Sequence, residues 1–256
     1  MPRARTISLP RYEEANLSLW TEALFPAELL LLSASPVYYG FGIPRGDGSA
    51  AVLIPGFLCG DTYLTPMRWW LDRIGYTASS SGIVNADCPN LLIQQRLTRT
   101  IENALQDTGR KIHLIGHSLG GIIARAIAAQ RPHDVASVIT LGSPFRGMAA
   151  HRSILHAAEL VRLQIVKEHG QNVLPDCYTG RCTCDFLKSL RSCMAASILQ
   201  TAVYTEEDGI VDWRCCTTND RDTDFKVHGT HVGLAFNPSV YQIIGQRLAE
   251  AASRAQ

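Results

Sequence analysis

The chain has 256 residues, a formal net charge of +1, and a composition that is 46% hydrophobic and 18% charged. These values are ordinary for a soluble globular protein, and they allow one well-buried core together with a sizeable insertion. The near-neutral charge and the lack of a basic run argue against binding to nucleic acid.

Near the N-terminus, the longest apolar run lies around residues 27–32 and is far shorter than the roughly 20 residues that span a bilayer. Glutamates before and within this run argue against a signal peptide, whose leading and apolar regions should not carry acids. We therefore expect no transmembrane segment, and we expect a helix from Tyr12 to Leu32 that packs on the domain. Without a signal peptide, the cytoplasm is slightly favoured.

Strand and helix patterns alternate along residues 50–146. AAVLIP (50–55) is a short apolar run between turn sequences, which predicts a buried strand. Further strands are predicted at YTASSSGIV (76–84), KIHLIG (111–116) and ASVITLGSP (136–144). Helical spacing occurs in TYLTPMRWWLDRIG (62–75), in NLLIQQRLTRTIENALQDTG (90–109) and after GHSLGG (116–121). The alternation predicts parallel strands joined by right-handed crossovers, and hence an α/β sheet.

The alternation stops after Gly147 and resumes near residue 197. In between, the sequence indicates helices and a cysteine-rich loop without a convincing strand. The strands ILQTAVYT and DFKV and the amphipathic helix PSVYQIIGQRLAEAAS then follow. Because ligands of open α/β sheets bind at the carboxyl ends of the strands, we interpret the insertion as a cap over a site. The expected organisation is an N-terminal helix and lead-in (1–47), a core (48–146 and 197–256) and a cap (147–196).

Eight cysteines are a high count, and six of them lie between residues 177 and 216. The spacing of Cys177, Cys182 and Cys184 does not match the paired C-x-x-C ligands of zinc sites, so we expect no metal there. We predict at least one disulfide in this group, which ties the cap or, through Cys215 or Cys216, fixes the loop beside them. Disulfides would make an oxidising compartment the alternative to the cytoplasm.

Ser118 stands between Gly116 and Gly120 in GHSLGG, after a predicted strand and before a predicted helix. This is the context that the nucleophile elbow G-x-S-x-G requires. The turn is tight enough that bulky residues two positions away would clash, which accounts for both glycines. Ser118 Oγ would point out of the sheet, and the Leu119 N–H would lie near any oxyanion formed at Ser118.

A serine hydroxyl needs a base beside it and an acid that orients the base. In the chain order typical of this elbow, the acid follows the serine and the histidine comes last. The candidate acids are Glu206, Glu207, Asp208 and Asp212, and the candidate bases are His228 and His231. The elbow should turn the side chain of His117 away, so we interpret His117 as a packing residue.

Four segments resemble bacterial serine lipases and esterases of the α/β-hydrolase superfamily: GHSLGG, EEDGIVDW, GTHVGLAFNP and IPGFLCGD. The resemblance covers about residues 48–252, apart from the cap. It implies an α/β-hydrolase fold, which is a mostly parallel central sheet flanked by helices, here with a helical cap insertion.

The resemblance also implies roles for single residues. In such lipases the Asp of a D-G-x-V loop is the acid and the His of a G-x-H-V-G-L stretch is the base, which points to Asp208 and His231. The first oxyanion donor follows the H-G or P-G pair after the early strand, which points to the backbone amide of Phe57, acting beside that of Leu119. Many lipases have His-Gly where this chain has Pro-Gly, but the role of a backbone donor is not affected.

The expected activity is hydrolysis of carboxylic esters through a Ser-His-Asp triad and an acyl-enzyme. The substrate would be a small-molecule or lipid ester, and no metal or organic cofactor is needed. An acyltransferase, a thioesterase or an amidase would use the same triad, so these alternatives stay open. A non-catalytic binding protein on a hydrolase fold is the remaining alternative, and the sequence does not indicate an oligomeric state.

Overall fold

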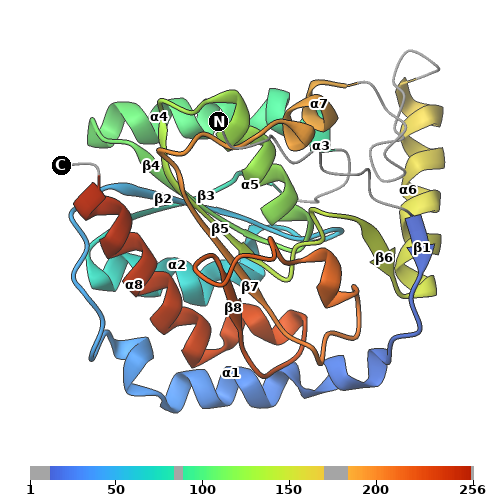
Figure 1. Ribbon diagram of the computed structural model, residues 1–256, viewed down its shortest axis with the longest axis horizontal. Helices are drawn as coiled ribbons and strands as arrows, with labels where there is room; N and C mark the ends of the chain where they lie inside the picture. Colours follow the sequence, from blue (N-terminus) through green and yellow to red (C-terminus); the bar gives the residue numbers. More distant parts are fainter. Residues whose placement is uncertain (1–11, 84–88, 170–183, 255–256) are drawn as a thin grey trace.

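The computed structural model of the protein describes residues 12–83, 89–169 and 184–254. Its centre is a six-stranded sheet in the order β3-β2-β4-β5-β7-β8, in which every neighbouring pair is parallel (Figure 1). The strands are β2 (Ala50–Ile54), β3 (Thr77–Ser80), β4 (Ile112–His117), β5 (Val135–Leu141), β7 (Leu199–Tyr204) and β8 (Asp224–Lys226). The predicted parallel α/β sheet is confirmed.

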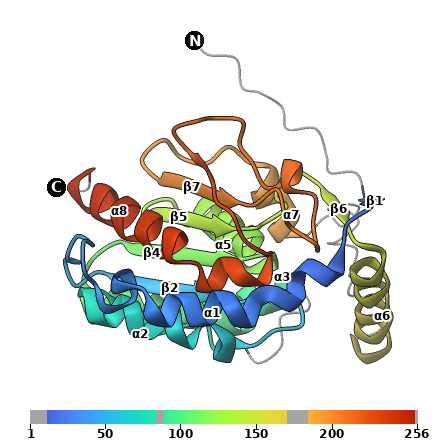
Figure 2. The same cartoon turned by 90° about the horizontal axis from the view of Figure 1, so that it is seen from below.

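Helices cover both faces of the sheet (Figure 2). One face carries α1 (Phe25–Ala34), α2 (Thr65–Ile74) and α8 (Pro238–Arg254), and the other carries α4 (Thr98–Thr108), α5 (Leu119–Gln130) and α7 (Asp185–Arg191). Successive residues of β2 alternate between these two apolar layers, Val52 facing α4 and α5, and Leu53 facing α2 and α8. A strand that is buried on both faces needs an unbroken apolar run, which is what residues 50–54 provide.

The N-terminal segment differs from its prediction. The sequence predicts one helix over residues 12–32, but the structure has a strand, β1 (Tyr12–Glu14), then a 3-10 helix (Leu19–Leu24), and α1 begins only at Phe25. The helix prediction is therefore wrong for the first half of the segment. Pro26 lies in the first turn of α1, where a missing N–H costs no hydrogen bond and the fixed φ of proline suits a helix start.

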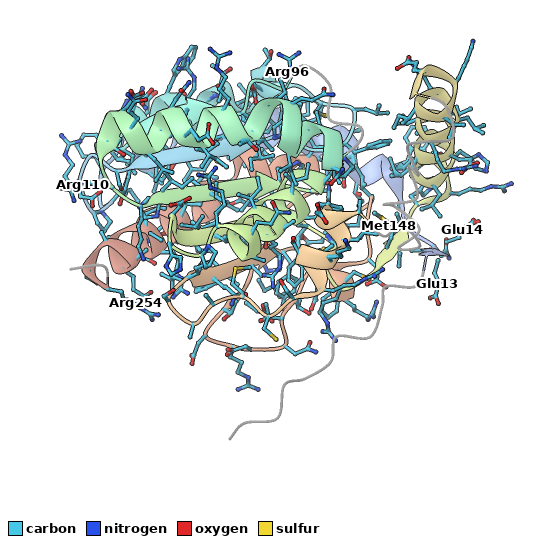
Figure 3. The ribbon with its side chains drawn as sticks, turned by 90° about the horizontal axis from the view of Figure 1, so that it is seen from above. Glu13, Glu14, Arg96, Arg110, Met148 and Arg254 are labelled. Carbon is cyan, nitrogen blue, oxygen red and sulfur yellow. The ribbon has the colours of Figure 1, made fainter. Side chains whose placement is uncertain are left out.

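β1 pairs in parallel with β6 (Met148–Ala150), a strand that the sequence does not predict. Each strand has only three residues, which is too short for a periodic pattern to be recognised. Figure 3 shows Glu13, Glu14 and Met148 at one edge of the molecule, next to α6 (Arg152–His169). The N-terminal segment is therefore tied to the residues that lead into the insertion.

The predicted helix at residues 90–109 is present but changes its pitch. α3 (Pro89–Leu92) continues through a π-helical turn (Ile93–Leu97) into α4, and the Thr98 Oγ1 donates to the Ile93 carbonyl across this turn at 2.8 Å. α4 ends at Gly109, whose φ of 61° lies in the left-handed region. The predicted glycine stop is confirmed.

The two helices of the insertion lie in different places. α6 stands at the side of the molecule, whereas α7 packs on α5 and buries Phe186 and Leu187 in the core layer of that face (Figure 2). The boundaries of the cap stay a prediction. In the part of the chain that the structure describes, no helix has both the length and the apolar character that crossing a membrane requires.

Candidate active site

Ser118 occupies the turn between the end of β4 and the start of α5. Its φ of 54° and ψ of −121° are unusual for a residue with a side chain. A Cβ at Gly116 would lie 2.3 Å from the backbone of Gly120, and a Cβ at Gly120 would lie 2.1 Å from the Ile54 carbonyl oxygen. Because these neighbours are backbone atoms that cannot move aside, the turn requires glycine at both positions.

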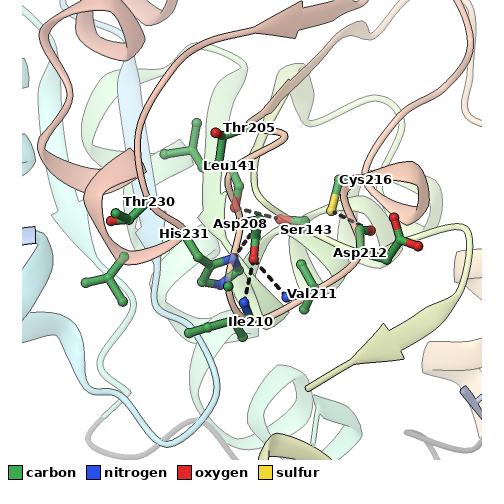
Figure 4. A network of polar contacts seen from close by, with 12 residues as sticks. Leu141, Ser143, Thr205, Asp208, Ile210, Val211, Asp212, Cys216, Thr230 and His231 are labelled. Carbon is green, nitrogen blue, oxygen red and sulfur yellow. Dashed lines mark hydrogen bonds and ion pairs between the residues drawn. The ribbon is translucent and has the colours of Figure 1, made fainter. Parts of the chain in front are cut away.

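Asp208 and His231 form a buried hydrogen-bonded pair (Figure 4). Asp208 Oδ2 lies 2.6 Å from His231 Nδ1, and the side chains are only 1% and 3% exposed. The other carboxylate oxygen, Oδ1, accepts from the backbone amides of Ile210 and Val211, each at 2.8 Å. Backbone amides of the loop that follows β7 therefore fix the orientation of the carboxylate, and its second oxygen is left to bond to His231.

The other candidate acids and the other candidate base do not join this pair. Each has a partner of its own: Asp212 pairs with Arg214, Glu206 with Lys226, and Glu207 with His228. The His228 side chain is 86% exposed. The structure thus brings together two of the six acid and base candidates, and leaves the other four at or near the surface.

The surroundings of His231 act on its pKa in opposite directions. Burial lowers the pKa of His231, because desolvation disfavours the imidazolium. The charge of Asp208, the hydrogen bond to it, and the charge of Glu22 more than offset this effect. The net result is a pKa of His231 above its usual 6.5.

A cavity of about 110 Å³ opens beside Ser118 and His231. Its walls come mainly from the residues after β2, from α5, from α6 and from the loop after Asp208. Most of the lining side chains are apolar: Phe57, Leu119, Ile122, Pro144, Met148, Ile154, Leu155, Ala158, Ile210, Val211 and Val232. Among the described residues that line it, there is no Asp, Glu, Lys or Arg. The cavity therefore suits an uncharged, apolar group.

Phe57 and Leu119, the expected oxyanion donors, both line this cavity together with Ser118. The turn before Phe57 approaches the serine closely, since a Cβ at Gly56 would lie 3.2 Å from Ser118 Cβ. Leu119 is the first residue of α5, where backbone N–H groups have no partner within the helix. The positions are compatible with the expected roles of both amides, which stay a proposal.

His117 has a larger part in the site than the packing role inferred from the sequence. Its Nε2 lies 2.8 Å from the backbone oxygen of His231, which can only accept, so Nε2 carries the proton. Its Nδ1 then accepts from the Tyr63 hydroxyl at 2.8 Å, and that hydroxyl accepts from the Gly56 amide. Burial, and then the neighbouring His231, lower the pKa of His117 to about 3. A neutral His117 therefore links the Phe57 turn to the His231 backbone.

A second serine–histidine pair lies away from this cavity. Ser137 Oγ is 2.8 Å from Nδ1 of His113, whose Nε2 lies 3.0 Å from Ser49 Oγ. His113 is at the start of β4, whereas Ser118 follows its end. These buried groups form a polar network between the strands, and neither Ser137 nor His113 lines the cavity beside Ser118.

Sequence reasoning missed two glutamates that contact the loop of His231. Glu22 and Glu28 come from the N-terminal segment, and both accept hydrogen bonds from backbone amides of residues 230–232. Their local sequence carries no motif that could have revealed this contact. Among the described residues, no group of three or more His, Cys, Asp or Glu side chains is arranged to hold a metal ion.

The sequence predicts a disulfide either in the cap or at Cys215 or Cys216, and the second of these predictions is wrong. Cys215 and Cys216 are free thiols, so no disulfide fixes the loop after Asp208. Cys216 is instead buried, and its Sγ lies 3.9 Å from the Asp212 carbonyl oxygen. Cys177 and Cys182 lie outside the described residues, and a disulfide in the cap stays a prediction.

Known proteins match this chain in sequence. Residues 78–206, about half of the chain, match the family described as palmitoyl protein thioesterase. A triacylglycerol lipase from Burkholderia plantarii is 33% identical over 146 residues, which cover 52% of this chain and 40% of that lipase. A triacylglycerol lipase from Pseudarthrobacter phenanthrenivorans is 45% identical over 106 residues, which cover 38% of this chain and 33% of that lipase. The matches thus span less than half of the length of these relatives.

Solved structures share the fold. A chain from a study of the metagenome-derived lipolytic enzymes LipS and LipT superposes with a TM-score of 0.53 at 12% identity, covering 82% of this chain and 96% of that chain. The mature lipase BlEst2 of Bacillus licheniformis superposes with a TM-score of 0.51 at 16% identity, covering 81% and 94%. At these identities the likeness shows the fold alone, and it confirms the α/β-hydrolase fold that the sequence resemblance implied.

Proposed function

Because the chain belongs to the palmitoyl protein thioesterase family of the α/β-hydrolase superfamily, we propose that it hydrolyses carboxylic esters through Ser118, His231 and Asp208. The observation that carries this proposal is the buried Asp208–His231 pair, whose histidine lines the same mostly apolar cavity as Ser118. The relatives named triacylglycerol lipase support ester hydrolysis as the reaction.

The chemistry follows from the atoms that remain available. His231 uses Nδ1 for Asp208, so Nε2 takes the proton of Ser118 Oγ while this oxygen attacks the ester carbonyl. The amides of Phe57 and Leu119 then stabilise the oxyanion, each such donor contributing about 3 kcal/mol. His231 returns the proton to the leaving alcohol, and an acyl group is left on Ser118. A water molecule, deprotonated by His231, releases the acid.

The cavity favours an apolar acyl group. The lining residues that the structure describes include aliphatic side chains of α5 and α6 and no charged side chain, so an anionic or cationic substituent would be desolvated without a partner among them. The same acyl-enzyme forms from a thioester, and the family match favours this second candidate activity. An ester and a thioester differ in the leaving group, and the side chains that line the cavity do not favour one leaving group over the other.

Hydrolysis of aryl esters with graded acyl chains, and of a thioester with the same acyl group, tests the proposal. We expect turnover of uncharged acyl chains and at least tenfold lower kcat/KM when the acyl chain ends in a carboxylate, because about 1.4 kcal/mol of desolvation corresponds to that factor. A higher kcat/KM for the thioester would make the second activity the principal one. No turnover of any of these substrates, together with no labelling of Ser118 by a serine-directed phosphonate, would overturn both.

The pH dependence should show the raised pKa of His231. The base can accept a proton only while it is neutral, so kcat/KM should be constant at high pH and fall as the pH drops through this pKa. We expect the midpoint of the acid limb above 6.5, the usual value for histidine, because Asp208 and Glu22 stabilise the imidazolium. Initial rates measured from about pH 5 to about pH 9 give this midpoint. A midpoint below 6.5 would mean that Asp208 and Glu22 do not raise the pKa of His231.

A further inference from the structure

Glu22, in the 3-10 helix before α1, accepts three hydrogen bonds from two different loops. Its Oε1 accepts from the amides of Gly209 at 2.9 Å and His231 at 3.0 Å, and its Oε2 accepts from the amide of Val232 at 2.9 Å. Gly209 directly follows Asp208. One carboxylate therefore joins the residue after the proposed acid to the proposed base and to the residue that follows the base.

The glycine after Asp208 leaves space for this segment. A Cβ at Gly209 would lie 2.4 Å from the Ser18 carbonyl oxygen and 2.7 Å from Thr21 Oγ1. The N-terminal segment is thus packed directly on the loop that carries the acid. β1 anchors the same segment to β6, and Ala150, the last residue of β6, pairs through its backbone with Val211 on the loop that follows Asp208.

We propose that Glu22 is a positioning residue, which holds the Asp208 loop and the His231 loop in the register that makes Asp208 and His231 meet. This proposal rests on the proposed function for its catalytic consequence. The two loops follow different strands and are separated in sequence, so the Asp208–His231 distance depends on what holds the loops together. The three hydrogen bonds to Glu22 hold the two loops at a fixed distance from each other. The hydrogen bond between Asp208 and His231 joins the same two loops at the site itself.

The charge of Glu22 also acts on the base. In the described part of the chain, the titratable side chains that contact His231 or its loop include Asp208, Glu22, Glu28 and His117, and Cys216 lies near Asp208. Burial raises the pKa of the Cys216 thiol well above its usual value, and burial lowers that of His117 to about 3, so both stay neutral near pH 7. Of the two N-terminal glutamates, Glu22 is the one whose charge raises the pKa of His231.

Glu22→Gln tests the proposal, because it keeps the shape of the side chain, removes the charge and turns one acceptor oxygen into a donor. At least one of the three amides then faces a donor. We expect kcat to fall about 10- to 100-fold, as for a lost hydrogen bond to a charged group, with KM changed less than about threefold. The acid limb of kcat/KM should move to lower pH, and so should the pKa of His231 measured by NMR titration of its ring protons.

Glu28→Gln is the matched control. Glu28 lies on the same segment and binds the same loop, accepting from the Thr230 amide at 2.8 Å and from the Thr230 hydroxyl at 2.6 Å. In the described part of the chain, the amides of Gly209 and His231 both donate to Glu22 rather than to Glu28. We expect a lower unfolding temperature for Glu28→Gln but no movement of the acid limb or of the His231 titration.

Two results would overturn the proposal. One is a Glu22→Gln enzyme that loses thermal stability but keeps both its kcat and its acid limb. The other is an equal shift of the His231 titration in both glutamate variants, which would make the segment a general anchor. If the wild-type protein turns over no ester or thioester, the proposed function has failed, yet the NMR titration still decides whether Glu22 acts on His231.

Discussion

Ser118→Ala should abolish ester hydrolysis, lowering kcat by about 10⁴- to 10⁶-fold, while the protein keeps its fold. The substitution removes the atom that we propose forms the acyl-enzyme, and it keeps the Cβ in a turn that already holds a side chain at a φ of 54°. The backbone amides of the proposed oxyanion site stay in place, so weak binding of substrate should persist. Initial rates measure the loss of activity, and a thermal melting profile shows whether the fold is kept. A serine-directed phosphonate should label the wild type at Ser118 and leave the variant unlabelled, as detected by mass.

Ser137→Ala provides the control for that experiment. It removes a serine that is also hydrogen-bonded to a histidine, but this pair lies in the polar network at the start of β4. We expect Ser137→Ala to retain ester hydrolysis within about threefold of wild type and to be labelled at Ser118, because it leaves every atom of the cavity unchanged. If Ser118→Ala retained a tenth of the activity with a native melting profile, Ser118 would not be the nucleophile.

Asp208→Asn should lower kcat by about 10⁴-fold with little change in KM. The asparagine can still accept from the Ile210 and Val211 amides, so the loop keeps its shape. Its amide nitrogen then faces His231 Nδ1 as a donor, which selects the tautomer with the proton on Nε2. That tautomer cannot take a proton from Ser118. The acid limb should also move to lower pH, because the charge that does most to raise the pKa of His231 is gone.

Asp212→Asn is the comparison for Asp208→Asn. Asp212 accepts from the Arg214 amide at 2.9 Å and pairs with the Arg214 side chain, at a position that does not face His231. We expect its activity within about tenfold of wild type and an unchanged acid limb. Initial rates of both variants, measured over the same pH series, test this expectation. A larger loss of activity in Asp212→Asn than in Asp208→Asn would mean that Asp212 is the acid.

The sequence by itself determined the parts of this protein that depend on local rules. An unbroken apolar run such as residues 50–54 can only be buried on both faces, and its alternation with helical segments leads to a parallel sheet. The need for glycine at position 116 is a steric requirement within six residues, because a Cβ there would meet the backbone of Gly120 in the same turn. The need for glycine at position 120 comes from the Ile54 carbonyl of β2, which only the tertiary structure brings to this turn. The helix assigned to residues 12–32 failed because its first residues pair with β6, a partner that local propensity does not contain.

Only the tertiary structure decided which groups meet. Four acids follow β7 within nine residues, and the family resemblance points to Asp208 among them. The structure shows that it is the Asp208 side chain, just before the bend at Gly209 and Ile210, that meets His231. Glu22 reaches His231 across 209 positions of the chain, and His117 reaches the His231 backbone across 114. Contacts of this kind arise when separate elements pack on a common core, because a carboxylate accepts whichever amides the fold brings to it. No pattern in the residues near either partner encodes them.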